Sequence, residues 1–403
     1  MLTQAHIDII KATAPLVGQH AREITDHFYP LMFQRYPAVK EIFNQSHQQK
    51  GSQPQALANA LVAYATHIDQ LGELSDAVKL IVHKHCSLNV LPEHYPIVGE
   101  CLIESVGAVL GEAVTAEIAA AWQAAYQQLA DLLINAEENL YQSNSERRGG
   151  WRGERAFRID RIVKESDVIS SFYLRPCEGE HLIDFTPGQY VGLIVELNGQ
   201  RVRRNYSLSD APGKEGVRIS VKRENDGLIS GYLHNCAATG DIVMLTAPAG
   251  SFVLDAAAAE TQRPLVFVTG GVGITPAFSM LNSCVASGRP IIFVHAAING
   301  RHHAFADDLS ALAREYANLR TFIIYEKPQL EDKPDAVGLV NQKTFEALLP
   351  PDRDVDLYFL GPKPFMANIN AFAESLGIPS SQRHYEFFGP AEQLSVLGSD
   401  NTH

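Results

Sequence analysis

The sequence predicts three successive domains: an all-α domain over residues 1–140, an antiparallel β-barrel over residues 153–262 and an α/β domain with a parallel sheet over residues 263–398. A linker at 141–152 and a tail at 399–403 complete the chain of 403 residues. Three observations predict this order. Apolar residues first recur at helical spacing, then short alternating runs appear between turn residues, and finally continuous apolar strands alternate with helices.

Composition excludes several classes of function. The net charge of -13 disfavours nucleic acid and anionic membranes as partners, and no apolar run approaches the length of a membrane span. Residues 1–12 contain His6, Asp8 and Lys11 instead of the apolar core of a secretion signal. The five cysteines are scattered and odd in number, which fits a reducing compartment. We therefore expect a cytoplasmic protein without a transmembrane segment.

The first domain shows helical periodicity and no hairpin signals. Helices are predicted over residues 4–18, 20–35, 38–44, 53–70, 75–87, 95–110 and 115–140. So many helices with short links indicate a globin-like or bundle packing.

One helix of this domain carries a histidine on its apolar stripe. Val78, Ile81, His85 and Leu88 recur at spacings of three and four, so His85 is predicted to point inward, whereas His83 falls on the polar side. An inward histidine is most often a core residue bonded to a backbone carbonyl. The alternative is an axial ligand to haem iron.

Two further residues bear on this choice. Tyr95 follows a turn marked by proline, and Glu137 lies near the end of a long helix with an apolar stripe. A carboxylate in that place is often simply solvated. If Glu137 instead reaches the second nitrogen of His85, it makes the imidazole a more basic ligand, which favours activation of dioxygen.

The second domain has the pattern of a small barrel. Alternating runs are found at residues 156–163, 168–175, 189–197, 201–209, 217–223 and 241–247, with glycine-containing turns between them. On the fourth run, Arg204, Tyr206 and Ser207 provide a fork for a phosphate, a ring that can stack on a flat cofactor, and a hydroxyl for a ring nitrogen. An exposed basic strand is the simpler interpretation of these residues alone.

The third domain alternates apolar strands at 265–269, 291–295, 320–325 and 356–360 with helices at 276–287, 304–316 and 364–376. A loop suited to a diphosphate follows the first strand, because its glycines allow close backbone approach and a helix begins directly after it. This loop comprises Gly270, Gly271, Val272, Gly273, Ile274 and Thr275. It departs from the usual GxGxxG pattern.

At these motifs the chain resembles the bacterial flavohaemoglobins over nearly its whole length. The first domain matches at Phe28 and Tyr29, Phe43 and Asn44, Gln53 with Leu57, Lys84 and His85, the run Tyr95 to Glu100, and Glu137. The resemblance implies that His85 is the proximal ligand of haem b, with Tyr95 and Glu137 as its hydrogen-bonded relay and Lys84 beside it. It also implies that Tyr29, Gln53 and Leu57 line the distal pocket and that Phe43 packs on the haem.

The rest of the chain resembles ferredoxin-reductase-type proteins. By that resemblance FAD is held by Tyr190, Arg204, Asn205, Tyr206, Ser207 and the helix opened by Ser230, with Glu386 and Phe388 against the flavin ring. NAD(P)H would bind at the loop from Gly270 to Thr275. The choice between NADH and NADPH stays open, with NADH preferred and Arg301 considered for a 2′-phosphate. Two departures from the family pattern are Pro30 directly after Tyr29, and Leu360 in place of a cysteine.

The activity implied by this resemblance is nitric oxide dioxygenation, in which nitric oxide and dioxygen become nitrate and NAD(P)H supplies electrons through FAD to haem. Such a protein would detoxify nitric oxide in the cytoplasm, as a monomer, and would accept a lipid or azole in its distal pocket. Two other functions remain open from the sequence. One is a haem-based oxygen or redox sensor, and the other is a flavin reductase that serves an external acceptor.

Overall fold

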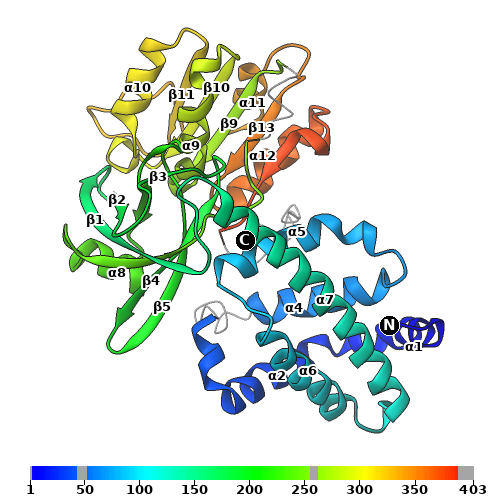
Figure 1. Cartoon of the computed structure of the whole chain (residues 1–403). Coiled ribbons are helices and arrows are strands. Elements are labelled where there is room, and N and C mark those ends of the chain that lie inside the picture. Colours follow the sequence, from blue (N-terminus) through cyan, green and yellow to red (C-terminus); the bar gives the residue numbers. More distant parts are fainter. Residues whose placement is uncertain (1, 43–51, 255–261, 389–403) are drawn as a thin grey trace.

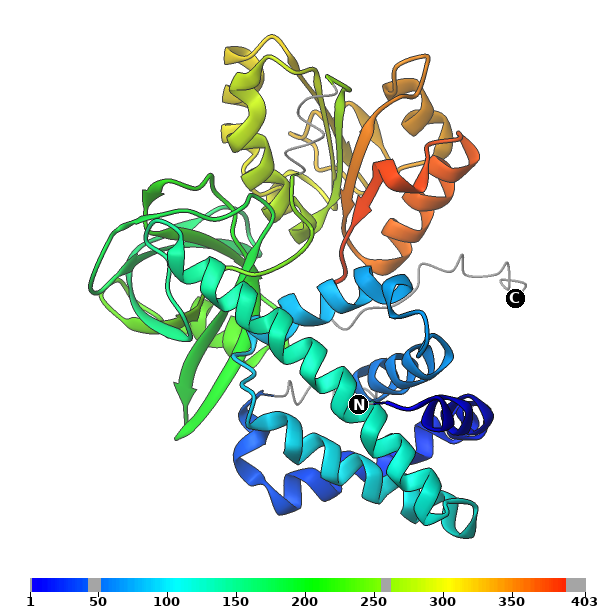
Figure 2. The same cartoon turned by 45° about the vertical axis from the view of Figure 1, so that its right-hand side comes forward.

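The computed structural model describes residues 2–42, 52–254 and 262–388, with only the backbone for residues 52–56 and 58. Three domains follow one another in the predicted order. Figures 1 and 2 show the N-terminal helices (blue to cyan) on one side, the β-barrel (green) beside them and the α/β domain (yellow to red) covering both. The three domains meet near the C-terminal end of α5.

The first domain is helical throughout its described part. Its elements are α1 (Gln4–Gln19), α2 (Ala21–Arg35), η1 (Pro37–Ile42), α4 (Ser52–Thr66), η2 (Leu71–Leu74), α5 (Ser75–Ser87), α6 (His94–Leu110), η3 (Gly111–Ala113) and α7 (Ala116–Glu146). Thr3 and Thr115 cap α1 and α7 by accepting bonds from the amides of His6 and Ile118. The helices pack around fully buried side chains such as Ile24, Phe28 and Met32. The predicted helices are confirmed, except that residues 37–42 form a 3-10 helix and that Phe43 lies outside the described residues.

Helix α7 is longer than predicted. It runs without interruption to Glu146, so the first residues of the predicted linker are helical. The physical reason is that one face of the added turn is buried: the Tyr141 hydroxyl donates to the carbonyl of Val90 at 2.8 Å, and the Asn144 amide donates to the carbonyl of Pro248 in the barrel at 3.1 Å. Because Tyr141 and Asn144 make these buried contacts only in helical geometry, the helix continues past residue 140.

The second domain is a six-stranded antiparallel sheet in the order β5-β4-β8-β1-β2-β7. Its strands are β1 (Glu154–Lys164), β2 (Ile169–Pro176), β4 (Tyr190–Leu197), β5 (Gln200–Ser207), β7 (Val217–Lys222) and β8 (Ile242–Thr246), with the short pair β3 (Leu182–Ile183) and β6 (Lys214–Glu215) and one helix, α8 (Leu228–Asn235). A bridge between Leu208 and Ile219 joins the continuation of β5 to β7 and closes the sheet on itself. All six predicted strands are confirmed.

The third domain is a parallel sheet in the order β12-β11-β10-β9-β13-β14. Its elements are β9 (Leu265–Gly270), η5 (Gly271–Gly273), α9 (Ile274–Cys284), η6 (Val285–Ser287), β10 (Ile291–Ala297), η7 (Gly300–His302), α10 (Ala306–Glu315), β11 (Leu319–Tyr325), β12 (Ala336–Val337), α11 (Gln342–Leu348), β13 (Asp356–Leu360), α12 (Lys363–Ser375), η8 (Ser380–Gln382) and β14 (Arg383–Tyr385). The order reverses between β9 and β13, which is where such sheets bind ligands. The loop from Gly270 to Thr275 ends on that point.

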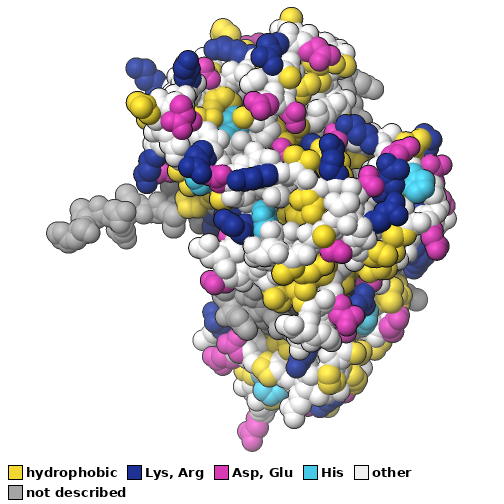
Figure 3. Space-filling view, turned by 90° about the vertical axis from the view of Figure 1, so that its left-hand side faces the viewer, with side chains coloured by type: hydrophobic (Ala, Val, Ile, Leu, Met, Phe, Trp, Pro, Cys, Tyr) yellow, Lys and Arg dark blue, Asp and Glu magenta, His cyan; other side chains and the backbone are white. Residues whose placement is uncertain are grey.

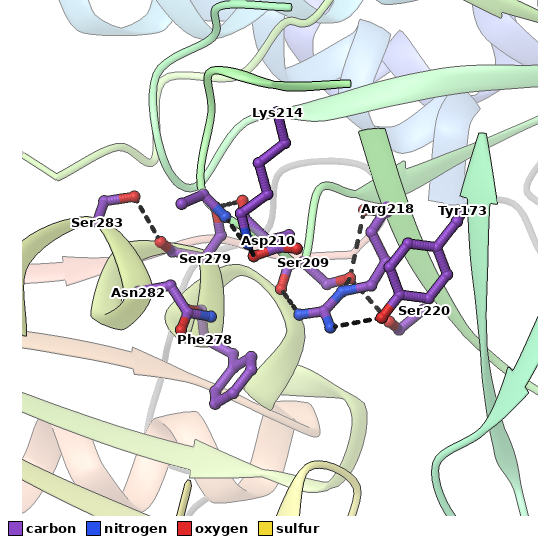
Figure 4. A network of polar contacts seen from close by, with 11 residues as sticks. Tyr173, Ser209, Asp210, Lys214, Arg218, Ser220, Phe278, Ser279, Asn282 and Ser283 are labelled. Atoms are coloured by element: carbon purple, nitrogen blue, oxygen red, sulfur yellow. Dashed lines mark hydrogen bonds and ion pairs between the residues drawn. The ribbon is translucent and has the colours of Figure 1, made fainter. Parts of the chain in front are cut away.

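A buried arginine joins the barrel to the α/β domain (Figure 4). The Arg218 guanidinium of β7 donates to the Ser209 hydroxyl at 3.1 Å and to the Tyr173 hydroxyl at 3.3 Å, and lies 4.8 Å from the ring centre of Phe305. From the other side, the Ser279 hydroxyl of α9 donates to the carbonyl of Asp210 at 2.6 Å. The contact between the barrel and the α/β domain thus combines polar and aromatic interactions, which fix the relative orientation of the two domains.

The surface carries both signs of charge side by side. On the face in Figure 3, basic and acidic side chains are interspersed, with hydrophobic side chains between them. Within the described ranges, none of the helices combines the length and apolarity needed to cross a membrane.

Candidate functional site

The site begins with His85 in the last turn of α5. Its Nδ1 lies 2.7 Å from Oε1 of Glu137 and 3.1 Å from the Tyr95 hydroxyl, and that hydroxyl donates to the same Glu137 oxygen at 2.5 Å. Glu137 is 2% exposed. A carboxylate only accepts, so Nδ1 carries the proton and donates to Glu137.

This geometry decides between the two interpretations of His85. Among the described residues the ring proton on Nδ1 goes to a buried carboxylate and not to a backbone carbonyl. The Nε2 lone pair is therefore fixed as the acceptor, which is the state in which an imidazole ligates iron. Burial also raises the pKa of Tyr95, which keeps the phenol protonated as a donor. These residues fit a haem ligated through His85.

We expect Glu137→Gln to raise the midpoint potential of the haem. The amide keeps the shape of the side chain but removes the negative charge that accepts the bond from His85 Nδ1. The imidazole then donates less electron density to the iron, and the ferric form loses stabilisation. The expected rise is about 60 mV, which corresponds to a tenfold change in a one-electron equilibrium. Spectroelectrochemistry measures it. Glu138→Gln is the matched control, since the Glu138 side chain is half exposed and pairs with Arg152, and an equal rise in both variants would refute the prediction.

The predicted distal residues are only partly described. Tyr29 is buried in α2, where its ring lies 4.8 Å from that of Phe28 and 5.9 Å from that of Phe33. Helix α2 continues through Pro30. Leu57 of α4 is half-buried and packs against the helical core. The side chain of Gln53 and the whole of Phe43 lie outside the described residues.

A cleft of about 830 Å³ lies where the three domains meet. Its size falls within the range of cofactor sites. Eight of the predicted cofactor residues line its wall, and these are Arg204, Asn205, Tyr206, Ser207, Ser230, Val272, Thr275 and Phe388. Two residues of η1 that the sequence did not indicate, Lys40 and Glu41, also line it, whereas Tyr190 and Glu386 do not. Because all three domains contribute, a cofactor bound there touches each of them.

A group of ionisable side chains, of which Tyr190 is buried and Lys84 and Glu386 are half-buried, joins α5, the barrel and the segment after β14. Lys84 Nζ is 5.8 Å from the ring centre of Tyr190, and Lys84 and Glu386 attract each other. Burial lowers the pKa of Lys84 and raises that of Tyr190. Three residues predicted separately, one from each domain, are thereby brought together.

The glycine-rich loop lies against the next strand of the sheet. Gly271 has φ of 54°, which glycine adopts readily, and the Thr275 hydroxyl donates to the carbonyl of Val272 at 3.0 Å. A Cβ on Gly273 would lie 2.4 Å from the carbonyl oxygen of Leu360. Gly270 ends β9, and Ile274 begins α9. The loop is thus packed so closely against the end of β13 that a side chain at residue 273 has no room.

One expectation about a single residue changes. His83 was predicted to point to solvent, but its Nδ1 accepts the amide of Gly250 of the barrel at 3.0 Å, and burial lowers its pKa to about 4. Arg301, which was considered for a 2′-phosphate, forms an ion pair through Nε with Asp167 of the barrel at 2.6 Å, while its side chain is largely exposed, so its role stays a prediction. The helical period alone cannot distinguish a face that meets solvent from one that meets another domain.

The fold and the site define a globin joined to a flavin- and nicotinamide-dependent reductase. Residues 26–133 match the globin family, residues 157–254 the oxidoreductase FAD-binding domain and residues 267–371 the oxidoreductase NAD-binding domain. Flavohemoproteins of Burkholderia sp. and of Pseudomonas aeruginosa are each 50% identical over 98% of this chain and all of their own length. The chain belongs to the flavohemoprotein family.

Solved structures agree with this assignment. A flavohemoglobin from Malassezia yamatoensis with bound FAD and heme superposes with a TM-score of 0.84 at 23% identity, over 96% of this chain and 100% of that one. The FAD/NAD-binding domain of nitric oxide dioxygenase from Vibrio cholerae is 34% identical, with a TM-score of 0.54, over 59% of this chain and 99% of its own. The first likeness supports the fold of the whole chain, and the second extends over its reductase part.

Proposed function

We propose that this protein is a nitric oxide dioxygenase, which converts nitric oxide and dioxygen to nitrate with NAD(P)H as the electron donor through FAD and haem. Two molecules of nitric oxide, two of dioxygen and one NAD(P)H give two nitrates, one NAD(P)⁺ and one proton. The observation that carries the proposal is the cleft shared by three domains, whose wall includes Lys40 of the helical domain, Arg204 of the barrel and Thr275 of the α/β domain.

The residues divide the work. When bound, NAD(P)H supplies a hydride, FAD divides its two electrons and haem iron takes them singly. His85 offers Nε2 to the iron, while Glu137 and Tyr95 fix its tautomer. Tyr29 is the distal residue with a phenol, a donor suited to negative charge that develops on a reacting oxygen.

The alternatives account for less of the structure. In a flavin reductase without haem, the hydrogen bond between His85 Nδ1 and the buried carboxylate of Glu137, 2.7 Å long, would have no function. A sensor needs a surface or domain that transmits its signal, whereas the matched families account for all three described domains as one electron-transfer chain.

Several finer features belong to the same proposal. We place the protein in the cytoplasm as a monomer that removes nitric oxide under nitrosative stress. Its distal pocket, which includes Leu57 in a largely apolar core, would also admit an apolar guest such as a lipid or an azole. NADH is the preferred donor in this proposal, and Arg301, whose exposed side chain pairs with Asp167, is the residue considered for a 2′-phosphate.

The stability of the protein should depend on pH through Glu386. Burial raises the pKa of its carboxyl from 4.5 to about 7, and attraction to Lys84 offsets this only in part. Between these values the folded protein holds a proton that the unfolded chain has released, so stability falls as the pH rises through this window. We expect the melting temperature of the wild type, relative to Glu386→Gln, to decrease from pH 5 to pH 8. Glu374→Gln, at an exposed position of α12, is the control and should show no such trend.

The test of the proposed function is the stoichiometry of the intact protein. Nitric oxide consumption, nitrate formation and NAD(P)H oxidation are followed together under air. Two nitrates per NAD(P)H support the dioxygenase. NAD(P)H oxidation that proceeds at the same rate without nitric oxide, and yields no nitrate, would contradict it.

A further inference from the structure

The last turn of α5, the haem helix, is attached to the barrel sheet, the flavin sheet, by several hydrogen bonds, and two of them are made by Ser87. Ser87 is completely buried at the end of α5. Its hydroxyl donates to the carbonyl of Lys84 at 2.7 Å and accepts a bond from the Asn205 side-chain amide at 2.9 Å. Its own carbonyl accepts the Thr246 hydroxyl at 3.2 Å. Both polar ends of Ser87 are thus bonded to the barrel.

Three neighbouring strands converge on this residue. Asn205 belongs to β5 and Thr246 to β8, and β4 lies between them, where the amide of Gly192 donates to the Thr246 hydroxyl at 2.8 Å. A Cβ on Gly192 would lie 2.5 Å from the carbonyl oxygen of Ser87. The helix end therefore touches the backbone of β4 directly, and this contact requires a glycine at residue 192.

The two ends of this contact are next to the residues assigned to the two cofactors. His85 is two residues before Ser87 on the same helix, and Asn205 lies between Arg204 and Tyr206 on β5. The Asn205 amide points to the globin, while its Oδ1 is buried without a hydrogen-bond partner in the described protein. A buried acceptor of this kind is suited to a donor on a bound cofactor.

We propose that Ser87 and Asn205 are positioning residues that hold the haem helix and the flavin strand at the spacing needed for electron transfer between them. The proposal rests on the proposed function only in needing electrons to pass from flavin to haem. Rigid elements joined by short bonds position groups more accurately than loops do. In Ser87→Ala the Asn205 amide loses this acceptor, whereas in Asn205→Ala the Ser87 hydroxyl keeps its bond to Lys84 but loses its bond to the barrel. In both variants the two domains are held less firmly at this point.

Two reaction rates of the holoprotein, both measured with NADH, distinguish reduction of the flavin from electron transfer between flavin and haem. Ferricyanide reduction reports delivery of electrons to the flavin, and anaerobic reduction of the haem, followed by stopped flow, reports the next step. In Ser87→Ala we expect haem reduction to slow about tenfold, since small misplacements of reacting groups cost up to about a hundredfold, while ferricyanide reduction is unchanged. Ser145→Ala is the matched control: Ser145 bonds to the carbonyl three residues earlier at 2.8 Å, as Ser87 does, but is exposed.

The asparagine provides a rescue. Asn205→Ala should slow haem reduction as Ser87→Ala does, per bound FAD, and Asn205→Gln, which keeps the amide donor, should restore at least half of the rate. Hydrogen exchange of the holoprotein gives a readout apart from turnover. Peptides covering residues 85–92 should exchange faster in Ser87→Ala than in wild type, with haem and FAD content equal.

The results also separate this inference from the proposed function. Haem reduction within twofold of wild type in both Ser87→Ala and Asn205→Ala would overturn the inference, as would a parallel fall in ferricyanide reduction in Ser87→Ala. If nitrate fails to form in the wild type but haem reduction still depends on Ser87, the inference stands and only the dioxygenase is refuted.

Discussion

His85→Ala is expected to give a folded flavoprotein that contains no haem. The ring is the only side chain of α5 whose proton is held by a buried carboxylate, so its Nε2 is the atom prepared for iron. Nitric oxide consumption should fall by more than about a hundredfold, because even the outer partners of a ligating histidine are worth about 10- to 100-fold. The Soret band should disappear, while NADH-driven ferricyanide reduction persists.

A second histidine of the same domain provides the control for this experiment. The Nδ1 of His67 lies 2.9 Å from the carbonyl of Ala63, one turn earlier in the chain, and its Nε2 lies 3.5 Å from the exposed carboxylate of Glu73, so His67→Ala removes only contacts at the surface of the helical domain. That variant should retain haem and full turnover. A Soret band in His85→Ala of wild-type intensity, with the spectrum of a histidine-ligated haem, would show that another residue binds the iron.

Gly273→Val should strongly slow the reduction of FAD by NADH. Three backbone atoms of the β13 end lie where the added Cβ would go: the Leu360 oxygen at 2.4 Å, the Leu360 carbonyl carbon at 2.6 Å and the Gly361 nitrogen at 2.9 Å. Backbone atoms in a packed sheet cannot turn away as a flexible side chain does. The loop must therefore move from the position in which we propose that it binds the diphosphate. Reduction of FAD by NADH should slow by about a hundredfold.

Reduction by dithionite shows whether the effect of the substitution is confined to that loop. With dithionite in place of NADH, Gly273→Val should reduce its haem as the wild type does. Gly107→Ala serves as the control, because a Cβ at that position of α6 meets nothing within 4 Å. It should gain up to about 1 kcal/mol of helix stability without loss of activity. Normal FAD reduction by NADH in Gly273→Val would exclude this loop as the nucleotide site.

The sequence predicted the elements with strong periodicity. The six barrel strands alternate, the four main strands of the α/β domain are continuously apolar, and His85 falls on an apolar stripe. It did not predict β12, α11 or β14, because elements of two to seven residues are too short for a period to show. The strand β14 is stabilised by pairing with β13, a partner distant in sequence that local propensity does not reveal.

The candidate site was predicted where a family motif exists and missed where domains touch. Tyr95, Glu137 and His85 do form one hydrogen-bonded group, and Arg204, Ser230 and other predicted cofactor residues do line one cleft. The roles of His83 and Ser87 depend on which surface of α5 meets the barrel. That surface is set by the packing of two domains, about which a helical period contains no information.

Because α7 continues without interruption to Glu146, it limits where the chain can be divided into separate domains. A cut at residue 140 would remove Tyr141, whose hydroxyl bonds to Val90, and Asn144, whose amide bonds to the barrel. A chimera that joins a foreign globin to residues 141–403 would inherit a broken helix and a Tyr141 hydroxyl that has lost its acceptor, the carbonyl of Val90. A recombinant globin fragment should therefore extend to Glu146, and the exchangeable junction lies beyond it.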